Sequence, residues 1–244
     1  MKFRLLKAAL IFVAILVSNI DSKAQETIDY DYSSEFIWGI TKATNSGLIG
    51  GFVLRYGRAV DDNKYQHFGL ELVNIKDPKE VRLSSTQTGK SFIQSKLNYL
   101  YNLRLQYGRE WVLFHKAQYQ GVQVNGILAG GFSMGMVTPY YYEYSEGDGT
   151  GSSTGPYDIS KMSQVIGPGK LFEGVPDMSI VPGGHIKAAL SFEFGAFKSS
   201  VFGFEGGFML EAYTKGIYIM APDVANSRQI YPNAFLTLFY GSRK

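Results

Sequence analysis

The sequence predicts an all-β fold, a transmembrane antiparallel up-and-down β-barrel of eight strands. Three observations favour this fold. Long segments alternate apolar and polar residues with period two, the connections between them alternate in length, and glycine (28 residues) and aromatic residues (15%) are abundant. The 244 residues suffice for one large β-domain or two small ones, and no internal boundary divides the chain.

The clearest alternation runs through residues 94–107, QSKLNYLYNLRLQY. Its odd positions from Leu97 onward are all leucine or tyrosine, whereas its even positions are polar except for Leu100. This pattern is typical of a strand with one apolar and one polar face. Strands of a β-sandwich also alternate, but they run to about 5–6 residues. The length of this segment therefore favours a membrane barrel.

Seven further segments bring the number of predicted strands to eight. In most of them the large apolar residues share one face, as Phe68, Leu70 and Leu72 do in the third. The last segment is apolar on both faces, so its orientation is not predicted. The predicted strands are residues 35–45, 48–60, 65–76, 94–107, 119–144, 185–197, 201–213 and 234–242.

The connections after the second, fourth and sixth strands are short, whereas those after the third, fifth and seventh are long. Only the first hairpin, at Ser46-Gly47, is short where its class is long. This alternation is typical of outer-membrane barrels, with long loops outside the cell and short turns and both termini in the periplasm. The longest extracellular loop, about 145–183, begins as a Gly- and Ser-rich tip. Within it, residues 159–166 fit a short amphipathic helix or a structured loop equally well.

Residues 1–24 have the layout of a secretory signal peptide that is cleaved on export. Basic residues precede an apolar run at 8–17, and Ser22 and Ala24 place small residues before the expected cleavage site. The barrel is therefore expected to occupy residues 25–244. The signal peptide contains four of the 24 basic and one of the 21 acidic residues, which leaves 20 of each. This balance gives no reason to expect a nucleic-acid partner.

The polar face of the strands is expected to line a lumen filled by side chains. An eight-stranded barrel has an interior just wide enough for that, and charges buried there must be paired and hydrogen-bonded. Four basic and four acidic residues are assigned to this face, which predicts a crosslinked interior without a continuous pore. The predicted lumen charge network is Arg55, Glu71, Lys96, Arg104, Lys187, Glu193, Glu205 and Glu211.

Aromatic residues near the strand ends are expected to form girdles at the two membrane interfaces, which tyrosine and tryptophan favour. For the sequence YYYEY, packing at the base of a loop is the alternative. The predicted girdle residues are Tyr56, Tyr107 and Trp111 on the periplasmic side and Tyr140, Tyr142 and Tyr144 on the extracellular side.

Signals for catalysis are weak, so we expect no enzymatic activity, no cofactor and no bound metal. The three histidines have no metal-ligand spacing, and without cysteine there is no disulfide, thiol nucleophile or cysteine–zinc site. The sequence EGDG at 146–149 lacks the spacing of a twelve-residue calcium loop. His185 with Ser191 and Glu193 is the one set of residues that suggests a hydrolytic triad.

Four segments carry a resemblance to known proteins: GVQVNGILAGGFSMGMVTPYYYEY, VPGGHIKAALSFEFG, EAYTKGIYIMA and the terminal GSRK. They resemble a group of small outer-membrane β-barrel proteins of Gram-negative bacteria. More loosely, the mature chain resembles OmpA-like eight-stranded barrels. The resemblance implies the fold and the location, and it implies no catalytic residues.

The chain departs from OmpA-like barrels in two ways. No peptidoglycan-binding domain follows the barrel, so an anchor to the cell wall is not expected. The sequence also continues past Phe239 and Tyr240 with Gly-Ser-Arg-Lys, whereas such barrels mostly end on an aromatic residue. This tail is expected either to protrude into the periplasm and engage a partner or to be frayed.

Together, these features predict a non-catalytic outer-membrane barrel that serves as a structural or accessory subunit of an envelope protein complex of the secretion or barrel-assembly type. Its expected partners are outer-membrane lipids, including lipopolysaccharide, and other outer-membrane or periplasmic proteins. A lipid A-modifying enzyme working from the outer face and a narrow channel are the alternatives.

Overall fold

The computed structural model describes residues 33–61, 63–115, 121–146, 151–170, 172–194 and 199–244. The predicted signal peptide and most of the EGDG sequence lie outside these ranges. Within them, no helix is long and apolar enough to cross a membrane.

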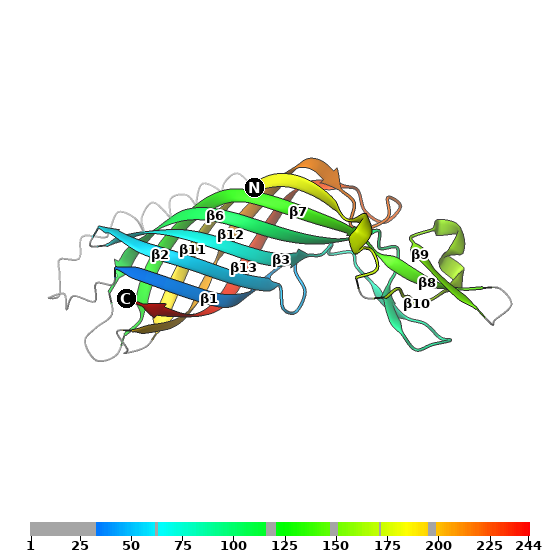
Figure 1. Cartoon of the computed structure of the whole chain (residues 1–244), viewed down its shortest axis with the longest axis horizontal. Coiled ribbons are helices and arrows are strands. Elements are labelled where there is room, and N and C mark those ends of the chain that lie inside the picture. Colours follow the sequence, from blue (N-terminus) through cyan, green and yellow to red (C-terminus); the bar gives the residue numbers. More distant parts are fainter. Residues whose placement is uncertain (1–32, 62, 116–120, 147–150, 171, 195–198) are drawn as a thin grey trace, which may run out of the picture. The chain divides into compact units, whose positions relative to one another are not determined.

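Eight antiparallel strands close into a barrel in the order β1-β13-β12-β11-β7-β6-β3-β2, which confirms the predicted fold class (Figure 1). The first and last strands pair along their length, for example Gly39 with Phe239, so the sheet has no free edge. The barrel strands are β1 (Ser34–Ala43), β2 (Gly51–Asp61), β3 (Lys64–Ile75), β6 (Asn98–Phe114), β7 (Gln123–Pro139), β11 (Ser179–Phe194), β12 (Ser200–Ile217) and β13 (Arg228–Arg243).

The fifth predicted strand, 119–144, is in fact divided between two sheets. The barrel strand β7 ends at Pro139, and the chain continues as β8 (Tyr141–Ser145), which pairs with β9 (Ser152–Pro156) and β10 (Val165–Pro168). Proline has no N–H to donate to a ladder, and the barrel sheet ends there. The alternation of residues continues because β8 is also a strand with one buried face.

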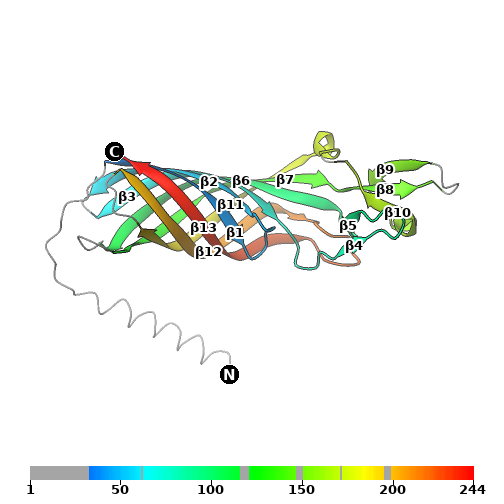
Figure 2. The same ribbon diagram turned by 90° about the horizontal axis from the view of Figure 1, so that it is seen from below.

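The long connections hold further short elements that gather at the end of the barrel opposite the C-terminus (Figure 2). Between β3 and β6 lies a hairpin of β4 (Arg82–Ser84) and β5 (Ser91–Ile93). Between β7 and β11 lie β8, β9 and β10 with two 3₁₀ helices, η1 (Ile159–Gln164) and η2 (Val175–Asp177). Asp158 caps η1 by accepting a hydrogen bond from the Ser160 amide.

The barrel strands bury alternate residues, and the exposed set is largely apolar. Along β6, for example, Asn102, Arg104 and Gln106 are buried, whereas Leu105 and Tyr107 are exposed. The surface of the barrel is therefore apolar and its interior polar, the reverse of a soluble protein. Outward apolar residues include Phe36, Trp38, Ile40, Phe52, Leu54, Phe68, Leu70, Leu72, Leu105, Leu128, Phe132, Ile186, Leu190, Phe202, Phe208, Leu210, Leu236 and Leu238.

Two inward glycines make room for large polar side chains in this narrow lumen. A Cβ on Gly108 would lie 2.5 Å from the imidazole of His67, and one on Gly69 would lie 2.5 Å from the amide nitrogen of Gln106. Glycine at these positions lets the neighbouring ring or amide lie against the backbone.

Candidate functional site: the charged lumen

A chain of ion pairs crosses the lumen. Arg104 on β6 binds Glu71 on β3 through Nη1 (3.2 Å) and Glu211 on β12 through Nη2 (3.0 Å). The Lys187 ammonium on β11 then bridges Glu71 (2.9 Å) and Glu205 on β12 (2.8 Å). All five side chains are at most 5% exposed, so each charge is satisfied by protein rather than by solvent.

The ion-pair chain continues from Glu205 to Arg55 on β2, whose Nη1 lies 2.9 Å from the carboxylate. Arg55 Nη2 also lies 4.0 Å from Glu35, and this contact joins the chain to Glu193, which Arg243 Nη2 binds at 2.5 Å. Arg243 also donates through Nε to Glu35. The structure therefore places seven of the eight predicted charges in the lumen. It also places three charged residues there that were not predicted: Glu35, Glu110 and Arg243.

The C-terminal tail is part of the barrel, which corrects the expectation that it protrudes or frays. Gly241, Ser242 and Arg243 pair with β1, and the first two also pair with β12. The Arg243 side chain lies in the lumen, where it forms ion pairs. The last strand therefore includes the tail that was expected to extend into the periplasm.

Lys96 is the exception among the predicted lumen charges. It lies two residues before β6 begins, so it follows no strand alternation. It is fully buried and binds Glu80 at 2.6 Å among the long connections. Burial lowers the pKa of Lys96, and the neighbouring Glu80 carboxylate opposes that shift.

Carboxamides add hydrogen bonds to the carboxylates of the lumen. Gln106 donates to Glu71 at 3.1 Å, and Asn102 donates to Glu211. Asn125 donates to both Glu110 (2.6 Å) and Glu193 (2.7 Å), and so holds two carboxylates beside each other. Charged and amide groups therefore form one connected network, as a buried polar cluster requires.

Two apolar clusters also pack inside the barrel, one among the charges near the termini and one at the opposite end. Ile37, Val201 and Phe239 form a cluster toward the termini. A larger cluster at the other end includes Leu100 and Met220, and it contains residues of the loop between β12 and β13. The cavity beside Glu71 and Arg104 has a volume of only about 10 Å³, room for one water molecule at most. Among the described residues, the part of the lumen beside Glu71 and Arg104 is therefore filled.

The three residues that suggest a hydrolytic triad are not brought together. His185 and Ser191 lie six positions apart on β11, about 20 Å along a strand. His185 Nδ1 instead lies 2.9 Å from Ser133 Oγ, and this hydroxyl donates to Glu211 at 2.7 Å. A serine whose one hydrogen is directed at a carboxylate is not activated by the imidazole. The described residues also hold no group of three or more side chains arranged for a metal.

The girdle residues divide into two groups. Tyr56 and Tyr107 are outward and 49% and 43% exposed, and Trp111 lies further along β6 toward the same end. The other three predicted girdle residues are buried instead, which is a correction. Beyond Pro139 the chain leaves the barrel, so the tyrosines form the core of the loop region. These residues are Tyr140, Tyr142 and Tyr144.

Tyr142 organises that loop core. Its fully buried hydroxyl accepts a hydrogen bond from the Lys96 amide (2.7 Å) and lies 2.8 Å from the Ile93 carbonyl, to which it donates. It thereby joins β8 to the segment that leads into β6. The ring packs edge-on against Tyr140 at a centroid distance of 4.7 Å. The long connections are therefore ordered by a small apolar core of their own.

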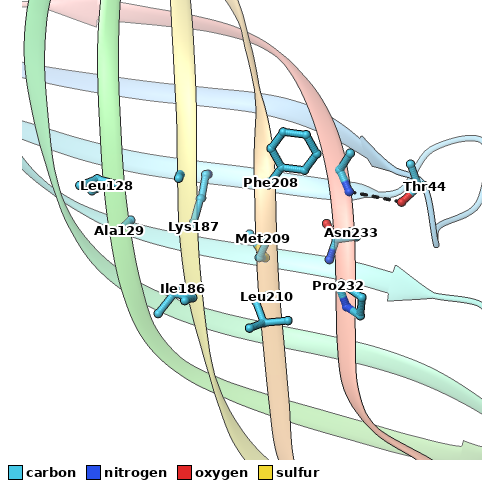
Figure 3. Close-up of a pocket in the computed structure, with 12 residues that line it drawn as sticks. Thr44, Leu128, Ala129, Ile186, Lys187, Phe208, Met209, Leu210, Pro232 and Asn233 are labelled. Carbon is cyan, nitrogen blue, oxygen red and sulfur yellow. Dashed lines mark hydrogen bonds between the residues drawn. The ribbon is translucent and has the colours of Figure 1, made fainter. Parts of the chain in front are cut away.

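An apolar groove of about 720 Å³ lies on the outer surface of the barrel (Figure 3). Leu128, Ile186, Phe208 and Leu210 project from neighbouring strands around it. Lys187 also lines the groove, but its ammonium lies on the lumen side of the sheet, where it binds Glu71 and Glu205. The groove is part of the apolar outer surface and offers no group for catalysis.

Replacing Arg243 by methionine is expected to lower the free energy of unfolding by about 1.5–3 kcal/mol, because hydrogen bonds to two buried carboxylates are lost. The neighbouring Lys244→Met variant is the matched control, since Lys244 is exposed and its loss should change stability by less than about 0.5 kcal/mol. Denaturant titration in lipid vesicles measures both. Equal stability of the two variants would show that the tail contributes nothing.

Comparison with known proteins gives matches at the level of structure only. No protein-family model matches the sequence, and no curated protein matches it significantly. The solved structures that match include the following three. Ail, the attachment invasion locus protein of Yersinia pestis, is 10% identical, with 88% of this chain and 100% of Ail covered and a TM-score of 0.39.

The N-terminal β-barrel domain of Pseudomonas aeruginosa OprF is 10% identical (87% and 98% covered, TM-score 0.36). Neisserial surface protein A is 9% identical (86% and 94% covered, TM-score 0.34). These are small outer-membrane barrels of the kind that the sequence resembles, and at this level of similarity they assign no function. By its own geometry, the chain is a closed eight-stranded barrel with an apolar surface and a charged lumen.

Proposed function

We propose that the chain is an integral outer-membrane β-barrel that acts as a non-catalytic structural or accessory subunit of an envelope protein complex. The inverted distribution of residues carries the membrane part of this proposal. Leucine and phenylalanine cover the outside of the barrel, whereas at least ten charged side chains are paired within it. A closed barrel satisfies its backbone groups internally and can therefore cross a bilayer.

The order of the connections supports an orientation within the membrane. The connections that contain β4–β5 and β8–β10 lie at one end, and the barrel termini lie at the other with the short turns. In outer-membrane barrels the long loops are extracellular and the short turns periplasmic. The ordered loop region, with its tyrosine core, is the surface that we assign to contacts with other envelope proteins.

The purified protein is expected to produce no discrete conductance in planar lipid bilayers, because ion pairs and apolar clusters occupy its lumen. An open porin in the same bilayer serves as the positive control. Insertion is verified separately by heat-dependent migration on gels. Reproducible single-channel steps from inserted protein would contradict the plugged lumen and favour the narrow channel.

A pull-down from gently solubilised native membranes tests the subunit role. Stoichiometric co-purification of other envelope proteins is the expected result, and a wash of raised ionic strength removes weakly bound contaminants. The molecular mass of lipid A from overexpressing cells is measured in parallel by mass spectrometry and is expected to be unchanged. A protein that elutes alone while lipid A changes mass would favour the lipid-modifying enzyme.

A further inference from the structure

A second cavity lies outside the lumen, where the long connections meet the barrel. Its volume is about 370 Å³, within the range of about 300–1,000 Å³ that is typical of small-molecule sites. The β4–β5 hairpin, the ends of β6 and β7 and the segment before η2 enclose it. Tyr99 and Tyr101 of β6 line one wall, and their rings stack at a centroid distance of 5.9 Å.

Two cations that form no salt bridge among the described residues line this cavity, although the charge of Lys170 helps to lower the pKa of the Glu143 carboxyl. Arg82 and Lys170 are both exposed, and neither forms an ion pair within the ranges that the structure describes. Glu173 also lines the cavity, but its carboxylate accepts hydrogen bonds from the Lys170 amide (2.9 Å) and the Thr154 hydroxyl (2.5 Å). With two basic residues and one acidic residue, the lining therefore carries a net positive charge.

The cavity wall is continuous with the apolar outer surface of the barrel. Tyr101 faces outward on β6 and is 37% exposed. Phe172 and Val175 line the cavity and are 74% and 44% exposed, and Ile180 continues the apolar surface on β11. A cavity with an apolar side next to a cationic side suits a ligand that has a hydrophobic part and an anionic part.

We propose that this cavity binds the phosphate-bearing headgroup of an anionic lipid in the leaflet beside the long loops. Arg82 and Lys170 contact the phosphate, since guanidinium and ammonium groups both bind phosphate oxygens. Tyr101 and Phe172 lie against the apolar part of the lipid, as aromatic residues do at membrane interfaces. The inference rests on the proposed membrane insertion and adds a lipid class and a site to it.

The test uses the full mature chain in phosphatidylcholine nanodiscs. Native mass spectrometry measures the binding of phosphorylated lipid A and of the same glycolipid without its phosphates. The wild type is expected to bind the phosphorylated form about tenfold more tightly. The double variant Arg82→Glu with Lys170→Glu should lose this preference. The control Lys161→Glu with Lys215→Glu makes the same charge change at exposed positions outside the cavity and should keep it.

Other outcomes would overturn the site. A preference that persists in the cavity variant, or that disappears equally in the control, would show that the cavity does not select the phosphate. Displacement of the lipid by inorganic phosphate would show that free phosphate, rather than a lipid, is the ligand. Heat-dependent gel mobility confirms insertion of each variant first, so failure of the barrel to insert is distinguished from failure of the site.

Discussion

Replacing Arg104 by methionine is expected to lower the free energy of unfolding by about 3–5 kcal/mol. The substitution keeps an unbranched aliphatic side chain and removes the charge between Glu71 and Glu211, to which Arg104 binds at 3.2 and 3.0 Å. Both carboxylates are almost fully buried, so water cannot replace the guanidinium. Denaturant titration of the protein in lipid vesicles measures the loss.

Arg109→Met is the matched control for Arg104→Met, because Arg109 lies on the same strand but is exposed. Its loss should change stability by less than about 0.5 kcal/mol. The double variant Arg104→Met with Glu211→Leu should be less destabilised than the sum of its single variants, since it removes both partners. Equal effects of the two arginine substitutions would mean that the lumen pairs do not stabilise the barrel.

Replacing Leu105 by arginine is expected to destabilise the barrel by about 2–4 kcal/mol, the cost of a charge on the lipid face near the bilayer midplane. Leu105 is 51% exposed and lies between Leu70 and Phe132 on the neighbouring strands, both also outward. The same change at Leu83, which lies in the β4–β5 hairpin and is 39% exposed, should have almost no effect.

The comparison of Leu105→Arg with Leu83→Arg separates a lipid-facing surface from a surface in water. Both leucines are partly exposed, so a protein in aqueous solution would tolerate arginine at either position. Unfolding midpoints in vesicles that coincide for the two variants would contradict the assignment of β6 to the membrane.

Period-two alternation predicted the lumen only where a strand is present. The odd or even position of a residue along its strand, its parity, assigned Arg104 and Glu71 to the lumen correctly, because β6 and β3 are continuous there. It failed at Lys96, which shares the parity of Arg104 but precedes the strand. It failed again beyond Pro139, because β8 has its own buried face, and periodicity does not identify the sheet to which a strand belongs.

Some lumen residues carried a signal that a longer reading of the pattern would have found. Glu110 has the parity of Arg104 and Gln106. It would have been assigned to the lumen if the predicted strand had been extended to Phe114, where β6 ends. Arg243 had no such signal, because a polar tail after an aromatic residue does not show that the last strand continues. The apolar clusters in the lumen explain why residues 234–242 could not be oriented: Phe235 and Phe239 pack inside, whereas Leu236 and Leu238 face out.

The most direct test of the inverted barrel uses single cysteines, since the chain has none of its own. Leu103, Leu105 and Tyr107 are replaced in turn by cysteine and labelled with a fluorophore, and quenching by brominated lipids is measured in vesicles. We predict strong quenching at all three positions, little at a label on Leu83, and no maleimide labelling of folded Asn102→Cys or Gln106→Cys. Unquenched labels at Leu103 and Leu105 together with reactive cysteines at Asn102 and Gln106 would contradict the account.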